Sequence, residues 1–329
     1  MSFFDDNTLN RPDENPPAQP TSDTSAQPSS TEPVASSLSG NPISYAGIAP
    51  AESSESNLPE DLRISWSWVH LLVFGVFAIT SLLSLQLVVI LYFSANRNLS
   101  QKQLKQLFES DPRLIIGMTV LWFALILFFL YITLAVLRDL PFWRSLGWTK
   151  LKSDPGEGQG RPWMYFLSGC GLSIFVALAS SRVKDVDNVP IQEFLKNRTG
   201  AMLLMAMAVL VAPLVEETVY RGYLYPVLAR TTSAVLQFFG MEFSSATRTG
   251  VVTSILVTGT LFGLMHAPQL GYTWGLVSLL TLVGVIFTFA RAWTGTVLAS
   301  FLLHLGYNSM IAFTSIIATK GFTHMPPHP

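Results

Sequence analysis

Long runs of apolar residues separated by short polar segments dominate this chain from residue 66 onward. A helix needs about 20 mostly apolar residues to cross the hydrocarbon core of a bilayer. The runs that approach or exceed this length are 66–93, 114–137, 163–180, 201–228, 251–265, 274–290 and 295–317. The pattern predicts an all-α fold, a polytopic transmembrane bundle of seven or eight helices, with boundaries good to a few residues.

The overall composition agrees with a protein that lies mostly in lipid. Of the 329 residues, 50% are hydrophobic and 12% are charged, and the mean hydropathy is +0.41. Soluble domains carry about 25% charged residues, so this chain lacks the charged surface that a soluble domain needs. No basic patch interleaved with aromatic residues is present, which argues against a nucleic acid partner.

The first 60 residues differ from the remainder in composition. Residues 1–61 contain ten of the 21 acidic residues but a single basic one, Arg11, and they are rich in Pro and Ser. Such a segment lacks the apolar surface to offset the entropy cost of ordering, so residues 1–60 are expected to form a disordered tail. The tail has no basic region followed by an apolar core, and we therefore expect no cleavable signal peptide.

Charges in the loops predict how the bundle is oriented. Five basic residues lie between 138 and 161, which favours a cytoplasmic loop and places the N-terminal tail in the cytoplasm as well. The loops 97–113 and 182–198 carry four basic residues each, so the bias is small. Aromatic residues that flank the apolar runs are expected at the membrane interface: Trp66, Trp68, Tyr92, Trp143, Trp148 and Trp163.

Two acidic residues, Glu216 and Glu217, lie inside an apolar run, in the segment Val-Ala-Pro-Leu-Val-Glu-Glu-Thr-Val-Tyr-Arg-Gly. A carboxylate at the bilayer centre costs roughly 3 kcal/mol on insertion scales. Ionisable groups in such places therefore indicate a functional site. The alternative is that both glutamates belong to a structural polar network between helices.

Helix geometry separates the expected roles of the two glutamates. Glu217 and Arg221 are four residues apart on one helix face, where a carboxylate and a guanidinium can pair. Glu216 is turned about 100° away, so we expect Glu217–Arg221 to be structural and Glu216 to be the reactive carboxylate. Pro213 lacks an N–H group and is expected to kink the helix and free the carbonyl of Val209.

Further polar residues recur at helical spacing towards the end of the chain. His266 follows Phe262 by four residues, and Asn308 follows His304 by four, so each pair lies on one helix face. If the helices turn near residues 241 and 292, Glu216 and both imidazoles lie at similar depths. Each of these residues could serve only helix packing, but their common depth favours one shared site.

A carboxylate, two imidazoles and an amide at one depth favour the activation of water. Glu216 can act as a general base on a water that His266 also holds, while His304 and Asn308 donate hydrogen bonds to an oxyanion. Alternatively, Glu216, His266 and His304 can bind Zn²⁺, as two histidines and a carboxylate do in hydrolytic zinc sites. The residue types alone leave zinc-dependent and metal-free catalysis open.

Three motifs together resemble the signature of the CAAX-protease and bacteriocin-processing family of intramembrane proteases: Glu216-Glu217-x-x-x-Arg221, Phe262-x-x-x-His266 and His304-x-x-x-Asn308. The family includes prenyl-protein endopeptidases and Abi-type bacterial proteins, and the resemblance covers about residues 200–315. It implies that Glu216 and His266 activate water and that His304 and Asn308 stabilise the oxyanion. The family is usually classed as metalloproteases, with metal-free glutamate catalysis as the other view.

The resemblance also divides the chain and suggests a function. After the tail, N-terminal transmembrane helices are expected at 61–195 and a CAAX-protease-like catalytic transmembrane domain at 200–318. The expected function is that of a membrane endopeptidase that hydrolyses a peptide bond in a membrane-anchored or lipidated protein. The alternatives are a non-catalytic membrane scaffold or bacteriocin-immunity protein of the same fold, and an ion-coupled transporter, for which no inverted repeat is evident.

Overall fold

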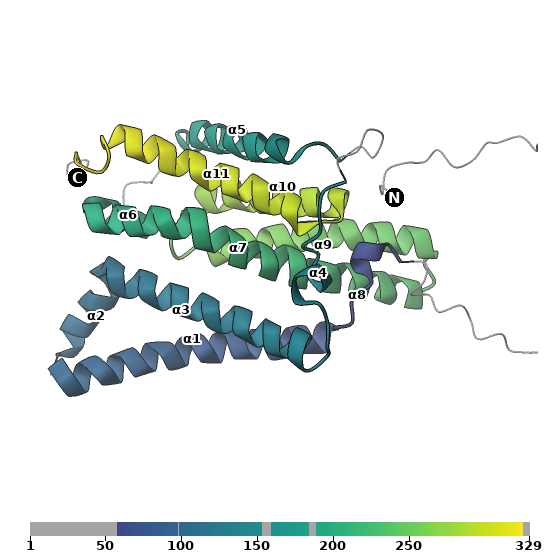
Figure 1. Ribbon diagram of the computed structural model, residues 1–329, viewed down its shortest axis with the longest axis horizontal. Coiled ribbons are helices and arrows are strands. Elements are labelled where there is room, and N and C mark those ends of the chain that lie inside the picture. Colours follow the sequence, from purple (N-terminus) through teal and green to yellow (C-terminus); the bar gives the residue numbers. More distant parts are fainter. Residues whose placement is uncertain (1–57, 98, 153–158, 184–188, 325–329) are drawn as a thin grey trace, which may run out of the picture. The chain divides into compact units, whose positions relative to one another are not determined.

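A computed structural model describes residues 58–97, 99–152, 159–183 and 189–324 of the chain (Figure 1). All regular elements within these ranges are helical, which confirms the all-α prediction for the described part of the chain. The predicted tail at 1–60 lies outside the described residues except for its last three positions.

Within the described residues, seven helical spans are long and apolar enough to cross a membrane, as the hydrophobic pattern predicts. They are α1 (Trp68–Arg97), α3 with the π-helical segment η2 (Pro112–Val136), α5 (Pro162–Ser180), α6 to α8 (Arg198–Phe238), α9 (Phe243–Met265), α10 (Trp274–Thr294) and α11 (Val297–Ala318). The fourth span ends at Phe238 rather than at the predicted residue 228, and the fifth begins at Phe243 rather than at the predicted residue 251. The reason is that residues such as Arg230 and Arg248 end the apolar run without ending the helix.

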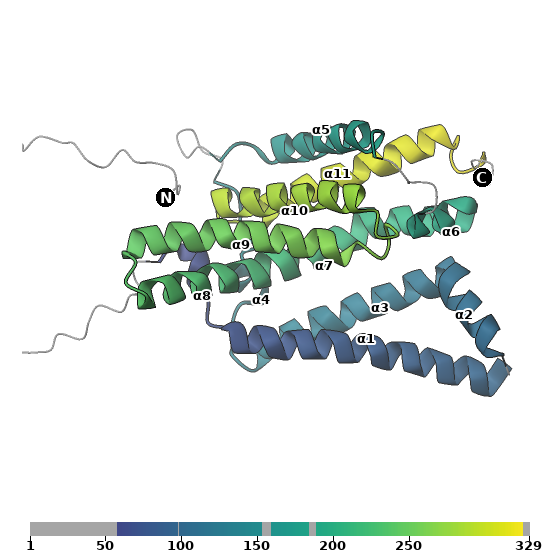
Figure 2. The ribbon, with the colours of Figure 1, turned by 180° about the vertical axis from the view of Figure 1, so that it is seen from behind.

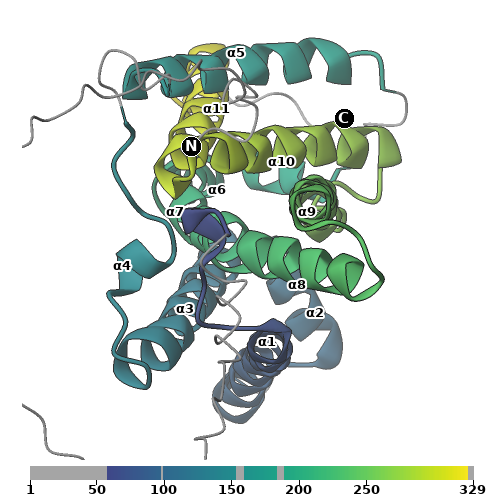
Figure 3. The same ribbon diagram turned by 90° about the vertical axis from the view of Figure 1, so that its right-hand side faces the viewer.

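Four short elements complete the fold: η1 (Glu60–Leu62), α2 (Gln101–Ser110), α4 (Phe142–Ser145) and η3 (Pro190–Lys196). Figures 1 and 2 show α1 and α3 side by side as a hairpin joined through α2, while the remaining spans form the main bundle. In that bundle α11 packs along α5, and α9 packs against both α8 and α10 (Figure 3). Residues from the fourth span and from α9 to α11 therefore meet in its interior.

The fourth span contains two π-helical segments that frame the predicted glutamates. α6 (Arg198–Ala206) passes into η4 (Met207–Val211), and α7 (Ala212–Glu217) passes into η5 (Thr218–Leu224), which precedes α8 (Tyr225–Phe238). A proline, which cannot donate a backbone hydrogen bond, lies two residues after the end of each π segment. It is Pro213 after η4 and Pro226 after η5. The helix thus departs from α-helical register on both sides of Glu216 and Glu217, as π segments often do at functional sites.

A tight turn sets the position of α11. Gly295 ends α10 with a φ of 68°, a left-handed conformation that glycine adopts without steric cost. The Thr296 side chain then caps α11 by accepting a hydrogen bond from the Leu298 N–H. The turn lies later than the predicted position near residue 292, so His304 is only about 12 Å into its helix instead of the expected 18 Å.

The segment before α1 begins with the short helix η1 and packs against the main bundle, and we call residues 59–67 the strap. Its side chains alternate between buried and exposed: Leu62, Ile64 and Trp66 are buried, whereas Arg63 and Ser65 are exposed. Trp66 was expected at the membrane interface but is only 2% exposed, because its ring stacks on Tyr223 in η5. The strap is therefore part of the packed core.

Glycines allow α5 and α11 to pack with their backbones in contact. A Cβ atom at Gly169 of α5 would overlap the Leu303 carbonyl, whereas one at Gly171 would meet nothing within 4 Å. We expect Gly169→Ala to destabilise the protein by about 1–3 kcal/mol through overpacking. Thermal unfolding in detergent should then occur roughly 3–10 °C lower. Gly171→Ala, on the same helix, is the matched control and should be neutral or slightly stabilising; equal effects of the two variants would contradict the packing argument.

Candidate active site

The predicted site residues come from three spans of the main bundle. Glu216 and Glu217 end α7, and Arg221 follows in the π segment η5. Phe262 lies on α9, and His266 is the residue directly after that helix. His304 and Asn308 lie one turn apart on α11.

The predicted pair of Glu217 and Arg221 is present and fully buried. Arg221 Nη1 donates to Glu217 Oε1 at 3.0 Å, and neither side chain is exposed. The other guanidinium nitrogens donate to α10: Nη2 to the Gly284 carbonyl at 2.9 Å and Nε to Thr288 Oγ1 at 3.2 Å. The guanidinium therefore joins the motif helix to α10, a contact that the sequence pattern did not predict.

His304 lies between the two glutamates. Its Nδ1 is 2.9 Å from Glu217 Oε1, and its Nε2 is 3.9 Å from Glu216 Oε2. Since the carboxylate of the Glu217–Arg221 pair accepts hydrogen bonds, Nδ1 carries a proton and Nε2 faces Glu216. Glu217 is thus both the partner of Arg221 and the group that orients His304, and the second of these roles was not predicted.

The two carboxylates differ in their access to the surroundings. The Glu216 side chain is 16% exposed, whereas that of Glu217 is fully buried. Glu216 forms its close contact with His304 and has no part in the hydrogen bonds of Arg221. The predicted pairing of Glu217 with Arg221 thus leaves Glu216 outside it, and the reactivity of Glu216 stays a prediction.

The Phe262 ring connects the two histidines. Its centroid lies 4.8 Å from that of His266 and 5.8 Å from that of His304, and the Arg221 guanidinium carbon lies 4.6 Å above the same ring. Phe262 thus packs against both imidazoles and the cation at once. Tyr220 and Phe287, which the motifs did not indicate, complete this aromatic shell.

The orientation of His266 is fixed by its own helix. Its Nδ1 lies 2.7 Å from the Phe262 carbonyl, and because a carbonyl can only accept, Nδ1 must donate. The Nε2 atom of the neutral ring is then an acceptor. In the described part of the chain no hydrogen bond or ion pair joins His266 to Glu216, so the two acceptors are available to a third molecule.

Asn308 makes a hydrogen bond to the backbone of the fourth span. Its Nδ2 donates to the Ala208 carbonyl at 2.7 Å, within the π segment η4. The Ala212 N–H donates to the Met207 carbonyl, five residues earlier, which is the π-helical pattern. In the same pattern the Ala208 carbonyl would accept from residue 213. That residue is Pro213, which has no N–H to donate. The prediction that Pro213 frees the Val209 carbonyl is therefore wrong by one residue, because the π segment shifts the register.

The residues proposed for zinc do not gather as a ligand set. Among the described residues, no three His, Cys, Asp or Glu side chains lie close enough together to hold a metal ion. His304 Nδ1 is engaged by Glu217, and the Phe262 ring packs against both His266 and His304. The predicted set of Glu216, His266 and His304 thus does not fit a zinc centre in this arrangement.

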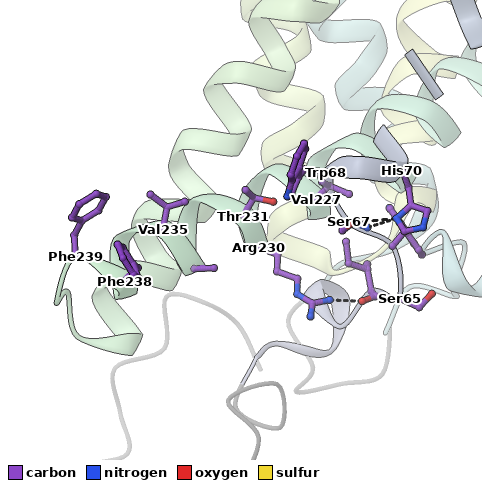
Figure 4. Close-up of a pocket in the computed structure, with 13 residues that line it drawn as sticks. Ser65, Ser67, Trp68, His70, Val227, Arg230, Thr231, Val235, Phe238 and Phe239 are labelled. Carbon is purple, nitrogen blue, oxygen red and sulfur yellow. Dashed lines mark hydrogen bonds between the residues drawn. The ribbon is translucent and has the colours of Figure 1, made fainter. Parts of the chain in front are cut away.

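A separate cavity of about 620 Å³ lies between the strap, the start of α1 and α8 (Figure 4). None of the motif residues lines it. Glu216, the predicted reactive carboxylate, precedes the lining residue Val227 by eleven residues, or roughly 16 Å of helix. This cavity is therefore not the candidate active site.

Comparison with known protein families places the motifs in a recognised domain. Residues 198–310 match the sequence model of a family described as type II CAAX prenyl endopeptidase Rce1-like. Comparisons with curated proteins and with solved structures gave no match. The matched range contains every residue of the three motifs, and seven candidate membrane spans agree with an integral multi-pass membrane protein. The match confirms the resemblance inferred from the motifs: residues 198–310 of this chain are similar to the Rce1-like family.

Proposed function

We propose that this protein is an intramembrane endopeptidase that hydrolyses a peptide bond of a membrane-associated protein by means of an activated water molecule. The observation that carries the proposal is the placement of the His304 ring between Glu216 and Glu217, with Nε2 directed at the more accessible carboxylate. The match to the Rce1-like family at residues 198–310 supports the same class of activity.

Glu216 and His266 are the proposed water-binding pair. Both present hydrogen-bond acceptors, so one water can donate one proton to a Glu216 oxygen and the other to His266 Nε2. The water oxygen then attacks the carbonyl carbon of the substrate as Glu216 takes its proton. Glu216 returns this proton to the amide nitrogen, the C–N bond breaks, and the products are a carboxylic acid and an amine.

His304 and Asn308 are the proposed donors to the oxyanion. Because His304 Nδ1 donates to Glu217, Nε2 can donate only when the ring carries a second proton. With that proton the cluster of Glu216, Glu217, Arg221 and His304 has no net charge, which lowers the cost of burying it. Asn308 uses one N–H on Ala208 and keeps the other for the oxyanion.

The proposed substrate is a membrane-anchored or lipidated protein, cut near its C-terminus or within a membrane segment. The family description names CAAX prenyl endopeptidases, so a peptide ending in a prenylated cysteine motif is the first substrate to test in a cell that prenylates proteins. The basic loop at 138–161 supports a cytoplasmic position for that loop and for the N-terminal tail.

The proposal is tested by incubating purified protein in lipid nanodiscs with matched peptides, one carrying an isoprenoid on a cysteine near the C-terminus and one without it. We expect a single internal cleavage, with the new carboxyl terminus identified by mass spectrometry and labelled by ¹⁸O from water. Intact peptides under all conditions, together with intact membrane-segment peptides, would refute the peptidase proposal.

We further propose that catalysis does not require zinc. Since the candidate ligands do not gather in the described residues, purified active protein should contain far less than one zinc per chain by elemental analysis. Its cleavage rate should change less than about twofold after dialysis against a strong chelator. One equivalent of zinc, with activity lost on chelation and restored by zinc alone, would establish a metal centre and overturn this point.

A further inference from the structure

Two tryptophans from outside the Rce1-like segment donate hydrogen bonds to the π segment that carries Arg221. Trp148 Nε1 donates to Thr218 Oγ1 at 3.1 Å, and Trp66 Nε1 donates to the Tyr223 carbonyl at 3.2 Å. Thr218 is the first residue of η5 and Tyr223 is its sixth. The π segment is therefore held near each end by parts of the chain that precede residue 198.

The contact at Tyr223 is a packed and buried one. The Trp66 and Tyr223 rings stack with centroids 5.5 Å apart and planes 11° from parallel, and both side chains are only 2% exposed. Phe74 of α1 also packs against Tyr223, with its centroid 5.2 Å from that of Tyr223. Tyr223 follows Arg221 by two residues, so its placement is tied to that of the Glu217–Arg221 pair.

The contact at Thr218 reaches the glutamates even more directly. Thr218 follows Glu217 in sequence, and its hydroxyl donates to the Leu214 carbonyl at 2.6 Å while it accepts from Trp148. In the same loop, the Leu146 carbonyl packs on Gly222, where a Cβ atom would come within 2.8 Å of it. Any side chain at residue 222 would thus push the loop away from η5.

Independent contacts hold the strap in place against the bundle. Asp61 Oδ2 pairs with Arg291 Nη1 of α10 at 3.1 Å. The guanidinium groups of Arg230 on α8 and Arg138 beyond η2 donate to two consecutive strap carbonyls, those of Ile64 and Ser65. Figure 4 shows Arg230 reaching the strap from α8. These contacts hold the strap backbone over the residues directly before Trp66, whose indole then reaches Tyr223.

We infer that Trp66 and Trp148 are positioning residues that hold the π segment η5 in the register that the active site needs. A π segment fits about one extra residue into a helix, so a return to α register turns the chain on one side of it by about 100° relative to the other side. Such a return turns Glu217 and Arg221 relative to His304. The hydrogen bond between Glu217 and His304 Nδ1, which orients the imidazole, would then be lost. The two indole donors oppose this change because they bond to η5 only in its present register.

The inference rests on the proposed function for its effect on catalysis, but its structural part can be measured separately. The variants are Trp66→Phe and Trp148→Phe, which keep an aromatic ring and remove the N–H donor. The controls are Trp68→Phe and Trp143→Phe, neighbouring tryptophans that are 54% and 47% exposed. Hydrogen–deuterium exchange of peptides covering 218–224 in nanodiscs reports on the register of η5. Cleavage kinetics report on how that register affects catalysis.

We expect Trp66→Phe and Trp148→Phe each to raise amide exchange across 218–224 at least fivefold while exchange in α10 and α11 is unchanged. We expect kcat to fall about tenfold with KM within twofold, since neither indole is placed to touch substrate, and we expect the two control variants to match wild type. Unchanged exchange in η5 overturns the inference, and so does raised exchange with wild-type kcat. If wild type cleaves no substrate, the proposed function fails and the exchange result alone decides whether the tryptophans hold η5.

Discussion

Glu216→Gln should lower kcat for peptide cleavage by about 10³ or more and leave KM within about twofold. The amide has the size of the carboxyl group and keeps an acceptor oxygen, but it cannot take a proton from water. General base catalysis contributes about 10² to 10⁴ in rate, and this variant also removes the charge that faces His304 Nε2 at 3.9 Å. Initial rates in nanodiscs over a range of substrate concentrations would separate kcat from KM.

A matched control for this variant is Glu242→Gln. Glu242 caps the start of α9 at the surface and accepts hydrogen bonds from Ser244 and Ser245, far from the motif residues in sequence. Its substitution should leave kcat within about twofold. If Glu216→Gln retained wild-type turnover with an unchanged melting temperature, the assignment of Glu216 as the base would be wrong.

Arg221→Met should destabilise the fold more than any other substitution considered for this site. It removes the cation that pairs with the fully buried Glu217 and also the hydrogen bonds to Gly284 and Thr288. Breaking a buried ion pair by removing one partner costs about 3–5 kcal/mol, because a charge is left without compensation. The melting temperature should fall by roughly 10 °C, and activity should be lost with it.

Combining Arg221→Met with Glu217→Gln separates the two functions of the pair. The double variant has no unpaired buried charge, so it should recover most of the lost stability. It should nevertheless remain at least 10²-fold slower than wild type, because a Gln side chain orients the His304 ring less strongly than a carboxylate does. Recovery of both stability and activity would show that Glu217 serves only to pair with Arg221.

The hydrophobic pattern predicted the membrane spans well because lipid imposes one simple requirement on each of them. Apolar length marks the part of a helix that lies in hydrocarbon, and the predicted runs match the observed spans on that basis. The same reasoning could not place the ends of α8 and α9, since a helix continues into water wherever its residues still favour it. Trp66 was misplaced because an interfacial tryptophan and a core tryptophan look alike in sequence.

Within the site, contacts along one helix were predictable and contacts between helices were not. The four-residue spacing of Glu217 and Arg221 predicted their pair directly. The bond from His304 to Glu217 joins residues 87 positions apart, and nothing in the spacing distinguishes Glu217 from Glu216 as its partner. The carbonyl that meets Asn308 was misassigned by one residue because the sequence showed the proline but not the π segment before it.

The segment η4 has a consequence for how relatives of this protein can be compared. A π segment fits about one extra residue into a helix, and each residue turns the chain by about 100°. Loss of one residue between positions 207 and 211 would keep every residue of the three motifs. It would still rotate Glu216 and Glu217 relative to the part of the helix that Asn308 anchors. Copies that share the three motifs but differ in length there would thus be inactive despite a complete signature.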